Sequence, residues 1–570
     1  SFGHITLSEG LEIGGVFKAS LSNNDAGTSN TIFGKSAGDA IASGGNYNVA
    51  IGEGAGGALT TGDTSVAVGF EALLTEDTNS ENTAIGYQAL KTQNGADGNT
   101  AVGMKAGLDL TTGASNVFVG AETAQNVVGG TDNVIIGKAA GGATTDVDKT
   151  VIIGRSAGAG VMTADADGTV AIGYQAGAAM TDPQDTNEVS VFIGYQAGNA
   201  NTIGSANIAL GYQALLTNVG SGRNTAIGYQ SLKVSTAGSA ADYFNTAVGY
   251  KSGVALTSGT HNTFIGGRAG IGTQLVDKTV IIGAEAGEGV MTADADGTIA
   301  IGYTAGTAIT SGQANVLIGF ESGKAITDGD YSVGVGYQTL KAQNKSGDAG
   351  NTAVGFKAGI AVTSGNHNVI VGRTAGFTAN TMSGSVLIGA EAGKLVTTSH
   401  DCIAIGRQAM GGATTTGDNN IAIGATAGDA LTSGKENLAI GKNALGASTD
   451  GDFNVAIGED SLAAVGSGIS NTAVGHTAGA AIDGGNYNTF LGFRAGKVTT
   501  AASSLVIIGV EAAQANMTSA ADGTIAIGAS ALAALTTGAR NTAVGYQVLD
   551  ALPDGSDNTA IGYNALGAAN

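Results

Sequence analysis

The amino-acid sequence predicts an all-β fold, a parallel β-solenoid (β-roll) of about 31 repeats of 17 residues. One motif recurs along the whole chain, as in Asn82–Leu90 (NTAIGYQAL), Asn224–Leu232 (NTAIGYQSL) and Asn558–Leu566 (NTAIGYNAL). Of the 30 intervals between successive copies, 22 are 17 residues and the others are 18, 19 or 21. A short, fixed period sustained over this length is typical of a solenoid.

Each repeat contains one clear strand, the apolar triplet before a glycine such as Gly86, which we define as position 0. Positions −3 and −1 are mostly Val, Ile or Thr and lie on one face of the strand. Position −2 lies on the opposite face and is apolar too, usually Ala and sometimes Phe or Ile. A strand that is apolar on both faces is expected to be buried on both. We therefore predict that −3 and −1 line the interior of the coil and that −2 faces a second chain.

The second half of the repeat has a different pattern. Position +1 is often Tyr or Phe, +2 is polar, +3 is usually Ala, and +4 is Gly or a larger apolar residue. A turn rich in Thr, Ser, Gly, Asp and Asn follows, so we predict two short strands and two tight turns per repeat. Position −4 is Asn in 20 of the 31 copies, and Cys402 occupies it once. Asn suits a left-handed corner and can form a ladder of stacked amides.

The repeats divide the chain into two parts. Residues 1–29 lack the pattern and are interpreted as an N-terminal cap or connector, with Leu11–Gly14 as an alternative, degenerate first copy. Residues 30–570 are predicted to form the solenoid shaft. Two of the longer turns are nearly identical, Val161–Thr169 and Val290–Thr298, and this similarity indicates duplication of a block of repeats.

Composition restricts the classes of function. With 97 Gly but only 2 Pro, the chain is not collagen, and its periodic apolar content of 42% argues against disorder. The net charge of −22 disfavours nucleic acid and anionic membranes as partners. No apolar run is long enough to cross a membrane.

Motifs for catalysis or cofactor binding are not found, so we predict no enzyme and no cofactor. The five histidines are scattered, and no pair has the spacing of metal ligands. The acidic turns offer weak calcium candidates in Asp165, Asp167, Asp294 and Asp296, but they lack the third oxygen residue and the final Glu of an EF-hand. The simpler interpretation is a solvated acidic turn.

The aromatic side chains at +1 are the one arguable recognition surface. Stacked aromatic rings can bind sugars or a protein partner, whereas the alternative is cross-strand packing with the hydroxyls in water. The tyrosines that form this stripe are Tyr87, Tyr174, Tyr195, Tyr212, Tyr229 and Tyr250.

The apolar −2 column predicts self-association. An apolar stripe along a whole shaft is not tolerated on a soluble monomer, and symmetry allows two chains or three. We expect no charged residue at this interface, which we assign to Ala84, Ala101, Phe118, Phe192, Ala226, Phe264, Phe490 and Ala560.

The Asn-x-Ala-Ile-Gly core of these repeats resembles the head repeat of trimeric autotransporter adhesins, the YadA-like head. The longer form at Asn82–Leu90 is also similar to repeats of phage tail fibres. The resemblance covers about residues 30–570 and implies a left-handed parallel β-roll in which three chains pack around one axis. The adhesin repeat is shorter than the 17 residues of most repeats here, which departs from that family.

The resemblance implies a structural fibre shaft of a phage tail fibre or similar virion appendage: an extracellular homotrimer that gives reach and attaches to a host-surface glycan or protein. The alternatives are the head of a bacterial trimeric surface adhesin, and an extracellular filament or matrix protein that assembles with itself. An ice-binding solenoid is disfavoured because Thr occupies position −3 in only about a third of the copies.

Overall fold

The computed structural model describes residues 11–13, 17–19, 27–181, 189–235 and 241–567. It is all-β, a parallel β-solenoid of about 31 turns, so the predicted fold class is confirmed. The described residues contain no α-helix. Three enlarged turns each hold a short 3₁₀ helix: η1 (Ala164–Ala166), η2 (Ala293–Ala295) and η3 (Ser519–Ala521).

The chain forms two compact units, residues 1–284 with 290–293 and residues 285–289 with 294–570. We call them unit 1 and unit 2. The solenoid strands of unit 1 are β3 (Thr31–Phe33), β4 (Val49–Ile51), β5 (Val66–Val68), β6 (Thr83–Ile85), β7 (Thr100–Val102), β8 (Val117–Val119), β9 (Val134–Ile136), β10 (Val151–Ile153), β11 (Val170–Ile172), β12 (Val191–Ile193), β13 (Ile208–Leu210), β15 (Thr225–Ile227), β17 (Thr246–Val248), β18 (Thr263–Ile265) and β19 (Val280–Ile282). Those of unit 2 are β20 (Ile299–Ile301), β21 (Val316–Ile318), β23 (Val333–Val335), β25 (Thr352–Val354), β26 (Val369–Val371), β27 (Val386–Ile388), β28 (Ile403–Ile405), β29 (Ile421–Ile423), β30 (Leu438–Ile440), β31 (Val455–Ile457), β32 (Thr472–Val474), β33 (Thr489–Leu491), β34 (Val506–Ile508), β35 (Ile525–Ile527), β36 (Thr542–Val544) and β37 (Thr559–Ile561).

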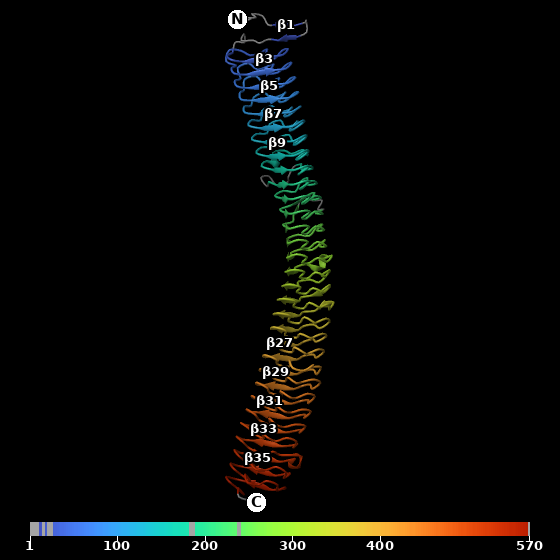
Figure 1. Cartoon of the computed structure of the whole chain (residues 1–570), viewed down its shortest axis with the longest axis vertical. Coiled ribbons are helices and arrows are strands. Elements are labelled where there is room, and N and C mark those ends of the chain that lie inside the picture. Colours follow the sequence, from blue (N-terminus) through green and yellow to red (C-terminus); the bar gives the residue numbers. More distant parts are fainter. Residues whose placement is uncertain (1–10, 14–16, 20–26, 182–188, 236–240, 568–570) are drawn as a thin grey trace, which may run out of the picture. The chain divides into compact units, whose positions relative to one another are not determined.

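Within each unit, every solenoid strand pairs in parallel with the next strand in the same register (Figure 1). Phe118 of β8 lies beside Ile135 of β9, for example, so that each repeat position forms a column across the coils. We keep the term column for such a set. Because register is shared, the side chain at one position always stacks on its counterpart in the next coil.

A few short strands lie outside this ladder. The strand β1 (Leu11–Ile13) pairs antiparallel with β2 (Phe17–Ala19), so the segment from Leu11 is not a degenerate first copy of the parallel repeat. At two of the turns, β14 (Ser221–Gly222) pairs with β16 (Ala241–Asp242) and β22 (Gly329–Asp330) pairs with β24 (Gly347–Asp348).

Apart from the short turn strands β14, β16, β22 and β24, the described coils lack the second strand predicted for each repeat, and stacked turns replace it. Positions +2 and +4 have left-handed backbone, as at Gln88 (φ 56°) and Leu90 (φ 47°). The Gln88 N–H donates to Phe70 of the preceding coil, whereas the Leu90 N–H donates to Ala106 of the following coil. Alternating handedness turns successive peptides in opposite directions, so their hydrogen bonds are satisfied without an extended strand.

The glycine at position 0 is required on two grounds. Its φ lies between 127° and 143° in every copy, a conformation that side chains strain. The backbone of the next coil also comes very close, because a Cβ on Gly103 would lie 2.2 Å from the carbonyl oxygen of Gly120. The glycine at position 0 therefore lets the backbones of successive coils approach more closely than any side chain would allow.

The structure reverses the predicted inside and outside of the strand. Position −2 is buried in every solenoid strand, while −3 and −1 are half-buried or exposed. The residues assigned to an interface between chains instead lie inside the coil of a single chain: Ala84, Ala101, Phe118, Phe192, Ala226, Phe264, Phe490 and Ala560. The prediction of these residues as a trimer interface is wrong, because the opposite wall of the same coil already covers them.

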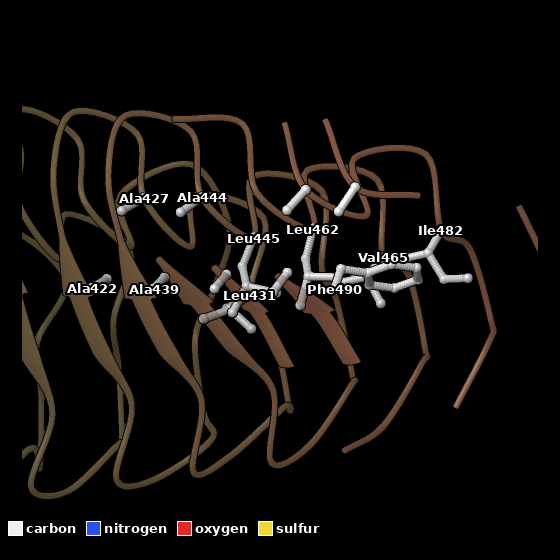
Figure 2. Close-up of a cluster of buried hydrophobic side chains, with 14 of the residues drawn as sticks. Ala422, Ala427, Leu431, Ala439, Ala444, Leu445, Leu462, Val465, Ile482 and Phe490 are labelled. Carbon is white, nitrogen blue, oxygen red and sulfur yellow. The ribbon is translucent and has the colours of Figure 1, made fainter. Parts of the chain in front are cut away.

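The coil interior is narrow, and side-chain sizes compensate across it. Figure 2 shows Ala422 and Ala439 of the −2 column facing Ala427 and Ala444 of the +3 column, with Leu431 filling the corner. Where −2 is Phe, position +4 of the preceding coil is Gly, and the four pairs are Phe118 with Gly107, Phe192 with Gly177, Phe264 with Gly253 and Phe490 with Gly479. A Cβ on Gly253 would lie 2.7 Å from the ring of Phe264, so the ring needs that glycine.

The −4 column forms the amide ladder expected from the sequence. Asn99 Oδ1 accepts hydrogen bonds from both the backbone N–H and the Nδ2 of Asn116, at 2.9 and 3.0 Å. Asn99 Nδ2 donates to the carbonyl of Gly113 at 2.8 Å. The left-handed corner itself falls one residue earlier, at −5, where Ser115 has φ 59°. These asparagines are buried, so each amide satisfies backbone groups that water cannot reach.

We expect Gly103→Ala to destabilise unit 1 by at least about 1–3 kcal/mol, because it combines strained φ with a backbone clash. Gly267→Ala is the matched control, since a Cβ there has nothing within 4 Å and its φ is not in the left-handed range. Thermal unfolding of both variants checks this, and equal melting temperatures would contradict it.

The neighbouring residues Ala226 and Ile227 test which face is inside. Ala226→Asp places an unpaired carboxylate in the coil interior and should cost more than the roughly 2–7 kcal/mol of burying a neutral polar group without a hydrogen bond. Ile227→Asp places its charge on the outer face and should leave the coil folded. Circular dichroism and hydrogen exchange of the two variants measure this; a larger loss of structure for Ile227→Asp would restore the opposite assignment.

Candidate interaction surface

The outer face of the strands is the main uncovered apolar surface of each unit. On the coil of β13, Ile208 at −3, Leu210 at −1 and Tyr212 at +1 are 42%, 43% and 41% exposed. Positions −3 and −1 lie on the same side of the strand, +1 follows at the start of the turn, and the three positions repeat in every coil. We call this set of three columns the outer face.

Aromatic rings of the +1 column stack directly on each other. In unit 1, the rings of Tyr174, Tyr195, Tyr212, Tyr229 and Tyr250 follow one another with centroids 5.0–5.3 Å apart and planes within 16°. Tyr87 stacks on Phe70 at 5.3 Å. Each inner ring therefore has a neighbour on both faces and presents only its edge and hydroxyl. A sugar ring cannot stack on the face of such a tyrosine, although contact with the edges stays open.

A second ladder of uncharged side chains runs beside these tyrosines. Gln196 Nε2 donates to Gln175 Oε1, and Gln213 and Gln230 continue the series at 2.9–3.0 Å. The amide ladder occupies the +2 column, next to the rings. Together the two ladders make a neutral stripe on a chain of net charge −22.

Several charged residues on the surface form ion pairs, most of them between neighbouring coils. The strongest group is Glu321, which is 11% exposed at its side chain and lies 2.6 Å from Lys324 and 2.7 Å from Lys341. Gln338 also donates to it at 2.7 Å. These hydrogen bonds from Lys324, Lys341 and Gln338 lower the pKa of the Glu321 carboxyl to about 2.

The weak calcium candidates do not converge. Asp165 lies in η1 and Asp294 in the equivalent η2. Asp167 instead accepts the backbone N–H of Asp148 at 2.6 Å, and partial burial raises the pKa of its carboxyl. Asp296 follows η2 in the corresponding position. Over the described ranges, no group of three or more His, Cys, Asp or Glu residues is placed to hold a metal ion.

Cys402 is a buried member of the −4 column. Its backbone N–H donates to Ser385 Oγ at 3.1 Å, which continues the ladder of the neighbouring asparagines. Burial raises the pKa of the Cys402 thiol to about 11, so the thiol stays protonated at neutral pH.

Comparison with known proteins does not assign the chain to a family: no family model matches it, and no curated protein matches it. In the part of the chain that the structure describes, no helix is long and apolar enough to span a membrane. The function is therefore argued from the outer face itself.

The sequence contained a signal that could have identified this face. Every Phe at −2 follows a Gly at +4 in the preceding repeat, as Phe264 follows Gly253. When a large side chain at one position is matched by a small one at another, the two positions pack against each other in the same interior. Read in that way, −2 is inside and the outer face consists of −3, −1 and +1.

Glu321→Gln should destabilise unit 2 by roughly 1–3 kcal/mol at neutral pH, because two charged hydrogen bonds are lost. The folded pKa is lowered from 4.5, so the contribution is present above pH 4.5 and disappears as the pH falls toward about 2. Thermal melts at pH 7 and pH 2 measure the difference from the unmodified chain. Glu459→Gln, whose exposed carboxylate pairs with Lys442, is the control and should have a smaller effect.

Proposed function

We propose that the chain is the structural shaft of an extracellular fibre, such as a phage tail fibre, and that it assembles as a parallel homotrimer. The proposal rests on the −3 and −1 columns of the outer face, which carry no charge, repeat regularly and are half-buried or exposed in a single chain. It also rests on the resemblance of the repeat to those of phage fibres and trimeric adhesins.

The size of the outer face supports self-association. Unit 1 holds fifteen solenoid strands of three residues, β3–β13 with β15, β17, β18 and β19. At about 4.8 Å between strands and about 3.3 Å per residue, their outer side covers roughly 700 Å². The largest apolar patch of a typical monomer is about 300–600 Å², whereas a stable interface buries about 800 Å² per partner.

The regular register supports a parallel arrangement of identical chains. Because each coil presents −3 and −1 at the same place, copies that align in parallel and in register bring the same columns together along a unit. Around a three-fold axis, three such faces cover one another and leave the opposite side of each coil in water. The three-fold order follows from the resemblance, since symmetry alone also allows two.

A shaft needs resistance to bending more than it needs a catalytic cleft. Hydrogen bonds from strand to strand, the −4 amides and the stacked rings all run between consecutive coils of a unit. Attachment to a host glycan or protein would use side chains left outside the interface. The edges and hydroxyls of the +1 tyrosines are the most regular of these.

Ile227→Asp together with Val248→Asp should convert the assembly to monomers whose coils remain folded, because both side chains lie on the outer face of adjacent strands. Native mass spectrometry and sedimentation of the unmodified chain should give a trimer. Ser235→Asp is the control, placing one charge in the buried interior, and should damage the coil instead. A stable, soluble monomer of the unmodified chain would overturn the proposal, and a dimer would overturn its three-fold order.

A further inference from the structure

The left-handed corner at position −5 carries exposed aromatic rings, two of which lie close together along the chain of unit 2. Phe453 and Tyr487 are 48% and 61% exposed. Neither has a ring beside it in its own column, because Glu436, Ser470 and Ser504 occupy −5 in the adjacent coils. The faces of these two rings are therefore not covered by stacking within the column, unlike those of the inner tyrosines at +1.

The two rings project from matching backbone on either side of Ser470. Phe453, Ser470 and Tyr487 have φ values of 58°, 57° and 60°. Each donates its backbone N–H to the carbonyl at −6 of the preceding coil, at 3.1, 2.9 and 3.1 Å. The strands β31, β32 and β33 that follow them pair in one shared register. The three Cα–Cβ bonds therefore leave successive coils in the same direction.

This column has the spacing of a ring stack from which the middle ring is missing. In the +1 column of the same unit, the rings of Phe320 and Tyr337 in successive coils have centroids 5.0 Å apart. Phe453 and Tyr487 are two coils apart, and twice the strand spacing is roughly 10 Å. Ser470 between them leaves a space as thick as one ring, which we call the ring gap. A ring centred there would lie about 5 Å from each neighbour, a distance typical of stacked rings.

Polar groups at position −6 flank the ring gap. Asn486 Oδ1 accepts the backbone N–H of Ile469 at 2.8 Å, and the Asn486 backbone N–H donates to Ser503 Oγ at 3.1 Å. Neither bond uses Asn486 Nδ2, which can donate to a ligand hydroxyl. Asp452 Oδ1 accepts the backbone N–H of Lys435 at 2.9 Å, and this bond does not use Oδ2, which can accept from a ligand hydroxyl.

The charge around the ring gap disfavours acidic ligands. Residues 435–504, which form the surrounding coils, carry six acidic and four basic side chains. Asp452 is next to Phe453 in the chain, and Glu436 follows Phe453 on the other side of the column. An anionic ligand would be repelled by both carboxylates, so the gap suits a neutral one.

We propose that the ring gap binds one neutral pyranose ring of a glycan, stacked between Phe453 and Tyr487 above Ser470. A pyranose has apolar C–H groups on its faces and hydroxyls around its edge, so its faces fit the two rings and its edge fits Asn486 and Asp452. Left-handed backbone favours Gly, Asn and Asp over aromatic residues, so the corner itself requires neither ring. The inference rests on the proposed function for the role of this glycan, which is an attachment target of the fibre.

The test measures binding of oligosaccharides to the full chain by saturation-transfer NMR. The neutral probes are oligomers of glucose, galactose, mannose and N-acetylglucosamine, and polygalacturonate is the anionic probe. At least one neutral probe should bind, and polygalacturonate should not. Tyr487→Ser introduces the residue that Ser470 and Ser504 already place at −5, so the coil should fold. Binding should weaken roughly tenfold, because one wall of the gap is lost.

The same substitution on the two sides of Tyr487 distinguishes the ring gap from a merely exposed ring. Ser470→Tyr fills the gap and should abolish binding, with the coil still folded by circular dichroism. Ser504→Tyr covers the other face of Tyr487, leaves the gap open and should bind the probe as the unmodified chain does.

Three results would each overturn the inference. The first is that no neutral probe binds the unmodified chain, or that only polygalacturonate does. The second is that Ser470→Tyr and Ser504→Tyr weaken binding equally. The third is that Tyr487→Ser changes the oligomeric mass in native mass spectrometry, which would make the ring a contact between chains. A monomeric unmodified chain that still binds a neutral probe would instead contradict the proposed assembly and leave the ring gap in place.

Discussion

The close approach of successive coils is the constraint on which the rest of the structure depends. Position 0 sets this distance, because the backbone of Gly103 packs against the carbonyl of Gly120 with no room for a side chain. Shared register then places every residue over its counterpart. Identical side chains in neighbouring coils stack favourably when they are amides, aromatic rings or branched apolar groups. It is not available to like charges, and the surface accordingly pairs lysine with glutamate between coils, as Lys442 does with Glu459.

The same constraint makes the interior too narrow for ordinary core packing. Alanine is the commonest residue of the −2 and +3 columns (Figure 2). A phenylalanine at −2 is accommodated where a glycine lies against its ring. Polar groups are admitted where a ladder satisfies them, as the −4 asparagines are. Glu76 and Gln93 depart from that rule, since each keeps one oxygen without a partner.

The alternation of the strand also determines which side chains are left outside. Each strand turns only its −2 side chain into the coil, so the side chains at −3 and −1, mostly Val, Ile or Thr, form the outer face. That face is what a single chain leaves uncovered, and it is why we propose assembly rather than catalysis as the role of the repeats. The stacked tyrosines border it and stiffen it, but their ring faces are already occupied by one another.

The sequence by itself determined the fold class, the repeat number and the ladder of asparagines, because a fixed period with a glycine and an amide at constant positions permits few other arrangements. It also located the tyrosine stripe and the long acidic turns. It could not decide which side of the Thr-Ala-Ile triplet is inside, since a strand that is apolar on both faces has no alternation to read. Only the tertiary structure decided that, by placing the opposite wall of the same coil against position −2, as Gly253 lies against the ring of Phe264. The buried environment of Glu76 was likewise invisible along the chain, because it depends on which residues the neighbouring coils place above and below it.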